Sequence, residues 1–246
     1  VPVTLLITAA IYAVAALVTF WLLREHARPD PDALRQQGLT ATWQRLQATW
    51  RQARQHPDFL WLMVCAVCYQ GGVAVAISLA AIYAEQVIGF QPQETMVLIF
   101  ALNAAAAAGA FAWGYLQDRI GHKIALGMTL VGWIVTCIIA ALTTTKGGFW
   151  WAAAIAGICM GSSQSAGRAM AGLFSPPRQL AEFYGLWTVA LRLAAIIGPL
   201  SYGAITWMTG GNQRVAILST AILFIAGLVL LFKVDVARGR EAALRA

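Results

Sequence analysis

Seven long, predominantly apolar runs divide this sequence and constrain its fold more than any other feature. An α-helix rises about 1.5 Å per residue, so about 20 apolar residues cross roughly 30 Å of hydrocarbon. Residues 102–112, LNAAAAAGAFA, lack the alternation of membrane β-barrel strands, which leaves helices to satisfy the backbone hydrogen bonds in lipid. We therefore predict an all-α integral membrane protein with seven transmembrane helices. The expected spans are residues 3–23, 59–83, 95–116, 124–142, 149–171, 184–208 and 215–232.

The composition agrees with a lipid environment. Hydrophobic residues make up 60% of the chain and charged residues 11%, whereas about 25% of a soluble domain is charged. All four cysteines, Cys65, Cys68, Cys137 and Cys159, fall within expected spans, where a thiol acts as a small apolar group. The first two have the spacing of a redox or metal pair, but no histidine cluster accompanies them. We predict neither a metal site nor a cofactor.

The basic residues that give the chain its net charge of +7 lie mostly in alternate loops. This is the pattern of the positive-inside rule, and it predicts a cytoplasmic C-terminus rather than a nucleic-acid partner. With an odd number of spans, Val1 is expected on the outer face. Val1 also begins inside an apolar run without an initiator Met, so we expect the chain to be a fragment. The residues on the positive side are Arg24, Arg28, Arg35, Arg45, Arg51, Arg54, Arg119, Lys123, Arg178, Lys233, Arg238, Arg240 and Arg245.

Residues 24–58 differ in composition from the spans and are predicted to form a cytoplasmic linker. Pro29, Pro31 and Gly38 interrupt the linker before a helical stretch at about residues 40–55. In that stretch apolar and basic residues occupy opposite faces, which is typical of a helix on an anionic membrane surface, although a partner-binding helix has the same pattern. The apolar residues are Trp43, Leu46 and Trp50, and the basic ones are Arg45, Arg51 and Arg54.

Residues 114–123, GYLQDRIGHK, resemble the major facilitator signature G-x-L-x-D-R-x-G-x-K/R. We expect Gly114 to allow close helix contact and Gly121 to permit a tight turn, while Asp118 forms a latch that can break. With Arg119 and Lys123 these residues form a predicted gating loop. The alternative is an ordinary charged turn.

This resemblance implies the domain organisation. It makes residues 1–23 the last helix of a missing N-terminal half and places the linker at 24–58. A C-terminal six-helix bundle would span 59–232, followed by a cytoplasmic tail at 233–246.

A narrower resemblance covers most of residues 59–232. Residues 174–199, FSPPRQLAEFYGLWTVALRLAAIIGP, preceded by Gln164-Ser-Ala-Gly-Arg168, are similar to the vacuole-effluxer, autophagy-related family and its bacterial relatives. The segment Tyr69-Gln70-Gly71-Gly72 is similar to another helix of that family, except that Gly71 stands where the family usually has an acid. The resemblance implies an amino-acid effluxer, here in a bacterial inner (plasma) membrane. Proton coupling would then reside in the other half, or not exist.

Two arginines lie within expected spans, where each costs roughly 3 kcal/mol unless it has a partner or a wet cavity. Gln164 lies four residues before Arg168, and Thr188 lies four before Arg192, so each pair shares a helix face. Together these residues form a candidate pocket for an anionic group. Arg168 could instead form a salt bridge to Asp118, or extend its side chain to the membrane surface.

Three polar residues nearer the middle of spans complete the candidate substrate site: Tyr69, Gln70 and Asn103. Gln70 and Asn103 fit an interhelical hydrogen bond as well as a substrate contact. Elsewhere, the ridge of Gly157, Gly161 and Ser165 predicts close helix packing. Gly198-Pro199 predicts a kink in its span.

The function that this sequence favours is secondary active transport, by alternating access, of a small anionic or zwitterionic solute such as an amino acid. Its other partners would be the lipid bilayer and either the missing half or a second copy of the chain. A non-transporting membrane sensor or scaffold is the alternative, favoured by the absent family carboxylate. An enzyme is not expected, because His26, His56 and His122 all lie in loops without a nucleophile and base nearby.

Overall fold

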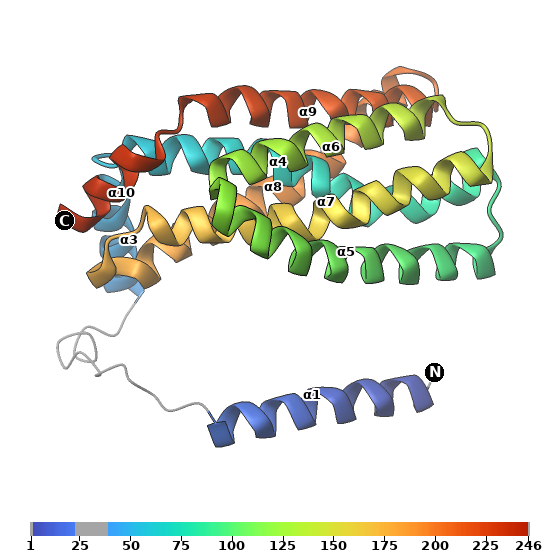
Figure 1. The fold of residues 1–246 in the computed structure, drawn as a ribbon. Coiled ribbons are helices and arrows are strands. Elements are labelled where there is room, and N and C mark those ends of the chain that lie inside the picture. The colour runs from blue at the N-terminus through green and yellow to red at the C-terminus, as the bar shows by residue number, and fades with distance from the viewer. Residues whose placement is uncertain (1, 23–38, 246) are drawn as a thin grey trace. The chain divides into compact units, whose positions relative to one another are not determined.

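A computed structural model describes residues 2–22 and 39–245, and this part of the chain is helical without a β-strand (Figure 1). Two short segments, η1 (Ala84–Ile88) and η2 (Pro177–Gln179), are a π-helix and a 3₁₀ turn. The predicted all-α class is therefore confirmed. The α-helices are α1 (Pro2–Leu22), α3 (Leu39–Ala53), α4 (Pro57–Tyr83), α5 (Pro92–Ile120), α6 (His122–Leu142), α7 (Lys146–Leu173), α8 (Leu180–Met208), α9 (Gln213–Lys233) and α10 (Val236–Arg245).

Each expected span falls within a described helix except for position 23, which lies outside the described residues. Within residues 2–22 and 39–245, six helices are long and apolar enough to cross a membrane: α1, α4, α5, α6, α8 and α9. The remaining helix, α7, is of similar length, but its glycine, serine and glutamine residues lower its hydropathy. A count of seven spans therefore stays a prediction.

The chain divides into two units, residues 1–45 and 46–246, and each is described by itself. In the first unit, α1 is a continuous apolar helix. Most of the second unit is a bundle of six long helices in which neighbours follow the order α8, α4, α9, α6, α7, α5 (Figure 1). The linker residues 24–38, including Pro29 and Pro31, lie outside the described residues.

Glycines bring α5 and α7 into backbone contact. A Cβ added at Gly157 would lie 2.6 Å from the Leu102 carbonyl oxygen, and one at Gly109 would lie 2.6 Å from that of Ile158. A Cβ at Gly161 would overlap the carbonyl oxygen of Ala106. In a membrane, where lipid is as apolar as leucine, such close van der Waals packing is a main source of helix association. The predicted packing role of this ridge is confirmed.

A second backbone contact joins α4 to α8. A Cβ at Gly198 would overlap the carbonyl oxygen of Gly71, so α8 reaches α4 only because position 198 has no side chain. The next residue, Pro199, lies inside α8 and cannot donate a backbone hydrogen bond. The helix assignment continues through this point, and the kink at Gly198-Pro199 stays a prediction.

The α5–α7 contact gives a direct test. Replacing Gly161 with alanine should destabilise the bundle by about 1–3 kcal/mol, because the added methyl group forces two backbones apart. The matched control is Gly203→Ala on α8, where an added Cβ has no neighbour within 4 Å among the described residues. The stability of both variants is measured by thermal unfolding of the purified protein in detergent. A Gly161→Ala protein as stable as Gly203→Ala would contradict the close contact.

Candidate functional site

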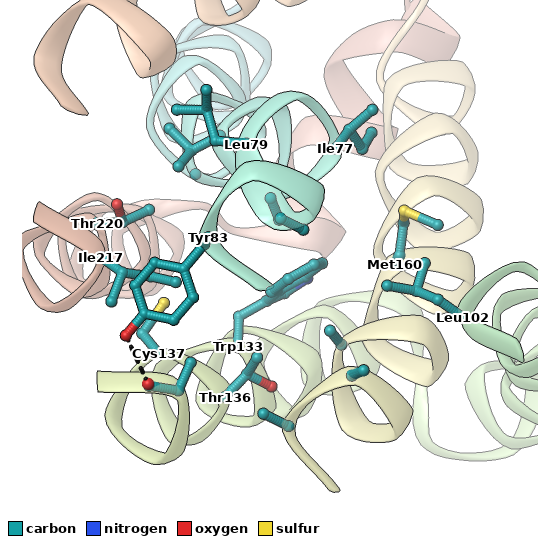
Figure 2. Close-up of a pocket in the computed structure, with 18 of the residues that line it drawn as sticks. Ile77, Leu79, Tyr83, Leu102, Trp133, Thr136, Cys137, Met160, Ile217 and Thr220 are labelled. Atoms are coloured by element: carbon teal, nitrogen blue, oxygen red, sulfur yellow. Dashed lines mark hydrogen bonds between the residues drawn. The ribbon is translucent and has the colours of Figure 1, made fainter. Parts of the chain in front are cut away.

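The bundle contains a partly open cavity of about 270 Å³. Protein interiors hold few voids larger than a water molecule, so a space of this size inside a packed bundle is a candidate ligand site. Figure 2 shows side chains from several helices around it. The cavity is lined from α4 by Gly72, Val75, Ala76, Ile77, Leu79, Ala80, Ala81 and Tyr83, from α5 by Leu98, Ile99, Leu102 and Asn103, from α6 by Trp133, Thr136, Cys137 and Ala140, from α7 by Phe149, Ala152, Ala153, Ala156 and Met160, from α8 by Tyr202, and from α9 by Ile217, Thr220 and Phe224.

Alanines on one face of α7 leave much of this space open. Ala152, Ala153 and Ala156 follow the three- and four-residue spacing of a helix face, and each is buried. Because their side chains end at Cβ, they leave open the space that the other helices line, while the glycines of α7 contact α5. The sequence of α7 therefore produces both the tight contact and the void.

The lining is almost entirely apolar, and among the described residues none of its side chains is charged. Three of its hydroxyl groups have backbone partners. Tyr83 donates to the Ala140 carbonyl oxygen at 2.8 Å, as Figure 2 shows, and Thr136 and Thr220 donate within their own helices. These groups need nothing from a ligand.

Two other polar groups of the lining lack such partners. The Nε1 of Trp133 and the hydroxyl of Tyr202 are buried, and neither forms a hydrogen bond with any described residue. Trp133 lies parallel to Phe224, with ring centroids 5.1 Å apart and an interplanar angle of 4°. The indole is thus held in a fixed orientation at the cavity wall.

The structure brings Gln70 and Gln164 together. Their side-chain amides exchange two hydrogen bonds, of 3.3 Å and 3.1 Å, between α4 and α7. Neither glutamine belongs to the cavity lining, although Gly72 and Met160 of the same two helices do. An amide has two donors and two acceptor sites, so each side chain keeps capacity for a further partner.

Asn103 also lines the cavity, but its amide nitrogen donates to the Ile99 carbonyl oxygen of its own helix at 2.8 Å. Tyr69 is fully buried and lies outside the cavity lining, and a Cβ at Gly167 would overlap its hydroxyl. These contacts give Asn103 a position at the cavity and Tyr69 a position in the helix packing. Whether either residue binds substrate stays a prediction.

Arg168 and Arg192 are exposed on α7 and α8. Thr188 donates to the Tyr184 carbonyl oxygen of its own helix at 2.9 Å, and the hydroxyl of Tyr184 donates to the backbone of Arg168 at 3.0 Å. Among the described residues, no hydrogen bond or ion pair joins the two guanidinium groups to Gln164 or Thr188. The anion pocket formed by these four residues therefore stays a prediction.

The loop between α5 and α6 contains the predicted turn. Gly121 has a φ of 89°, a conformation that favours glycine. Lys123 donates to the carbonyl oxygens of Val234 at 2.6 Å and Phe232 at 3.4 Å, and so satisfies acceptors at the C-terminal end of α9. The loop is thereby attached to the helix that ends the bundle.

Two expectations for this loop are not met. A Cβ at Gly114 would have no described neighbour within 4 Å, so the predicted close helix contact is wrong in this part of the chain. Asp118 is exposed and forms no ion pair with Arg168 or any other described residue. Instead Gln117 donates to the Ser165 hydroxyl oxygen at 3.2 Å, because it is Gln117 that faces α7.

A family model described as "Vacuole effluxer Atg22 like" matches residues 1–244. The chain belongs to this family. The resemblance seen in the signature loop and in α8 is thus confirmed.

Curated relatives of this Atg22-like chain are distant. An uncharacterized MFS-type transporter, YxiO, of Bacillus subtilis is 26% identical over 190 residues, which cover 77% of this chain and 44% of the relative. Autophagy-related protein 22-1 of Penicillium rubens is 25% identical over 251 residues, or 92% of this chain and 41% of the relative. The Atg22-like chain therefore spans less than half the length of either protein.

Solved structures support the fold. A crystal structure titled as a bacterial homolog to the human lysosomal transporter Spinster, inward-facing and occupied, matches with a TM-score of 0.59 at 18% identity. The match covers 92% of this chain and 56% of that one. The inward-facing, unoccupied form matches with a TM-score of 0.51 at 20% identity. The Atg22-like chain has the helical arrangement of these transporters.

One buried charge of the Atg22-like bundle was missed by sequence reasoning, which placed every acidic residue in a loop, tail or span edge. Asp58, at the start of α4, has a side chain only 2% exposed. Its carboxylate accepts two hydrogen bonds of 2.7 Å from the guanidinium of Arg238 and one of 2.7 Å from the backbone of Asp235. Hydrogen bonding to Asp58 raises the pKa of Arg238 above its ordinary value. The pair joins α10 to the start of α4, beside the attachment made by Lys123 at Val234.

We expect Asp58→Asn to loosen α10, because the amide can still accept from Asp235 but no longer forms an ion pair with Arg238. Trypsin should then cleave after Arg240 roughly tenfold faster, since cleavage follows the population of locally opened chains. Glu241→Gln is the control, because it removes an ion pair with Arg245 inside α10 itself. Equal cleavage rates for the two variants would show that Asp58 does not hold α10.

Proposed function

We propose that this chain is the C-terminal bundle of a secondary active transporter that moves a small anionic or zwitterionic solute, such as an amino acid, by alternating access. The observation that carries the proposal is a cavity in a bundle of the Atg22-like family, together with the Gln70–Gln164 pair that links two of the helices lining it. Transport sites of this kind lie near the middle of the membrane, between repeated bundles that rock against each other.

In this proposal the polar groups bind the charged part of the solute. The amides of Gln70 and Gln164 exchange their mutual hydrogen bonds for bonds to an ammonium or carboxylate group, since an amide both donates and accepts. Arg168 and Arg192, exposed on α7 and α8, attract the carboxylate. Because the pair links α4 to α7, binding at these amides changes a contact between two helices of the bundle.

The pathway requires a second bundle, and the proposal assigns this role to another six-helix half or to a second copy of the chain. The short coverage of the curated relatives supports the first assignment, because each has a region of comparable length outside the match. The signature loop and α10 would then face the cytoplasm, in accordance with the basic residues Lys123 and Arg238. The amphipathic face of α3 would lie on the membrane surface.

A non-transporting sensor or scaffold is the second candidate. The observation in its favour is Gly71, which stands where the family usually has an acid and lies instead against the backbone of Gly198. Without that carboxylate, this bundle offers no titratable group at the position for proton coupling.

Flux measurements with the full-length parent protein in proteoliposomes separate the two candidates. We expect saturable uptake of at least one amino acid, and a KM raised about tenfold or more by Gln70→Leu or Gln164→Leu, because each variant removes an amide that contacts the solute. The control is Gln93→Leu, at an exposed position near the start of α5. Absence of saturable flux for every solute tested would favour the scaffold.

A further inference from the structure

The lining of the cavity is apolar. The groups that bind the charged part of the solute in the proposed function are polar or charged. We infer that the cavity binds an uncharged, largely apolar group that carries one or more hydrogen-bond acceptors, and that Trp133 and Tyr202 are each a donor to such an acceptor. The inference rests on the proposed function in one respect, since it takes the bound group to be part of the transported solute. It adds a specificity site within the bundle.

The size and lining of the cavity determine what fits. An engineered apolar cavity of about 150 Å³ binds benzene, so about 270 Å³ accommodates a two-ring group or a branched chain of similar bulk. Moving an ionised group into a site without charged partners carries a large desolvation cost. The charged part of a solute must therefore remain outside the apolar space, for example at the Gln70–Gln164 pair.

The hydrogen-bonding groups of the lining identify the acceptor. Most buried polar groups in proteins have a partner, and the hydroxyls of Tyr83, Thr136 and Thr220 follow this rule. Trp133 is 2% exposed and Tyr202 is 7% exposed, and both lack a partner among the described residues. An indole N–H can only donate, so its missing partner is an acceptor such as a carbonyl, ether or hydroxyl oxygen.

The walls are built to select by size. Trp133 is held by its parallel contact with Phe224, and Tyr83 is held by its hydrogen bond to Ala140, as Figure 2 shows for the latter. The alanines of α7 also limit the space, with backbone and Cβ atoms that cannot move aside easily. A longer side chain at one of these alanines would occupy the volume that the ligand needs.

Cys137 provides a readout at the cavity itself, because it lines the space. Its thiol is only 5% exposed and reacts slowly, so reagent concentration and time are first set to give full modification without a probe. The full-length protein is prepared with Cys65, Cys68 and Cys159 changed to alanine and any cysteine of the remaining half removed, and it is reconstituted in nanodiscs. Mass spectrometry then follows the modification of Cys137 by methyl methanethiosulfonate. The probes are 1-indanone, which has a carbonyl acceptor, and indane, a hydrocarbon of nearly the same shape.

We expect 1-indanone to protect Cys137 at lower concentration than indane. Tyr202→Phe should weaken protection by 1-indanone about three- to tenfold and leave protection by indane unchanged, since it removes one donor and little volume. Trp133→Phe also removes part of a ring from the cavity wall, so it should weaken protection by 1-indanone about three- to tenfold more than protection by indane. Tyr202→Phe should be at least as stable as the unmodified protein without a probe, because it removes an unpartnered buried hydroxyl. Trp133→Phe also removes buried volume beside Phe224, so some loss of stability is expected from it. Equal protection by both probes, or unchanged protection in both variants, would overturn the assignment of the donors.

Filling the cavity tests the site independently of the donors. Ala153→Leu should abolish protection by both probes, whereas Ala154→Leu, at the adjacent exposed position of α7, should have no effect. If neither probe protects Cys137 in the unmodified protein, the cavity is not a binding site. If Ala153→Leu protein fails to fold, Ala156→Val serves the same purpose with a smaller increase in volume.

The solutes used in the flux measurements also test whether the apolar group in the cavity belongs to the solute or to a lipid. Protection of Cys137 by a solute with a bulky uncharged side chain, and none by glycine, supports the inference. Protection that changes only with the acyl chains of the nanodisc lipid would assign the cavity to a lipid and overturn it. Probe protection without flux of any solute would refute the proposed transport and the solute assignment, whereas flux without protection would refute the cavity site alone.

Discussion

The bundle depends on backbone contacts that only glycine permits. Gly157 and Gly161 bring α7 against α5, and Gly198 brings α8 against α4. Lipid supplies no hydrophobic force between helices, so the closeness of these contacts determines which helices associate. The neighbour order of the six helices begins and ends with these two pairs, and α9 and α6 complete it. The cavity lies inside this arrangement, where the alanines of α7 leave space between the helices.

The ends of the helices are held by a different kind of interaction. Asp58 and Lys123 attach the segment around Val234 and Arg238 from two sides, so that the start of α4, the signature loop and α10 are connected. These are charge-assisted hydrogen bonds, which are stronger and more directional than the van der Waals contacts along the bundle. In the proposed transport cycle, a bundle fixed at one end in this way would rotate as a unit.

The sequence predicted features that depend on local composition and spacing. The helical spans, the turn at Gly121 and the packing ridge at Gly157 are of this kind, because hydropathy, positive φ and small-residue spacing are properties of neighbouring residues. The glutamine pair was half predicted: Gln70 and Gln164 were both chosen, but not as partners. The close helix contact predicted at Gly114 is absent for the same reason. A glycine allows a close approach, but its presence in the sequence does not show that another helix lies there.

The sequence by itself therefore determined that this is a helical membrane bundle of the transporter type, because about 20 apolar residues in a row and a ten-residue signature can be recognised without knowing the fold. Only the tertiary structure decided that Asp58 binds Arg238, 180 positions away, and that Trp133 and Tyr202 line one cavity without partners. The physical reason is that burial and hydrogen bonding depend on which helix faces meet. That arrangement follows from the glycine contacts between helices, and no single segment of the sequence specifies it.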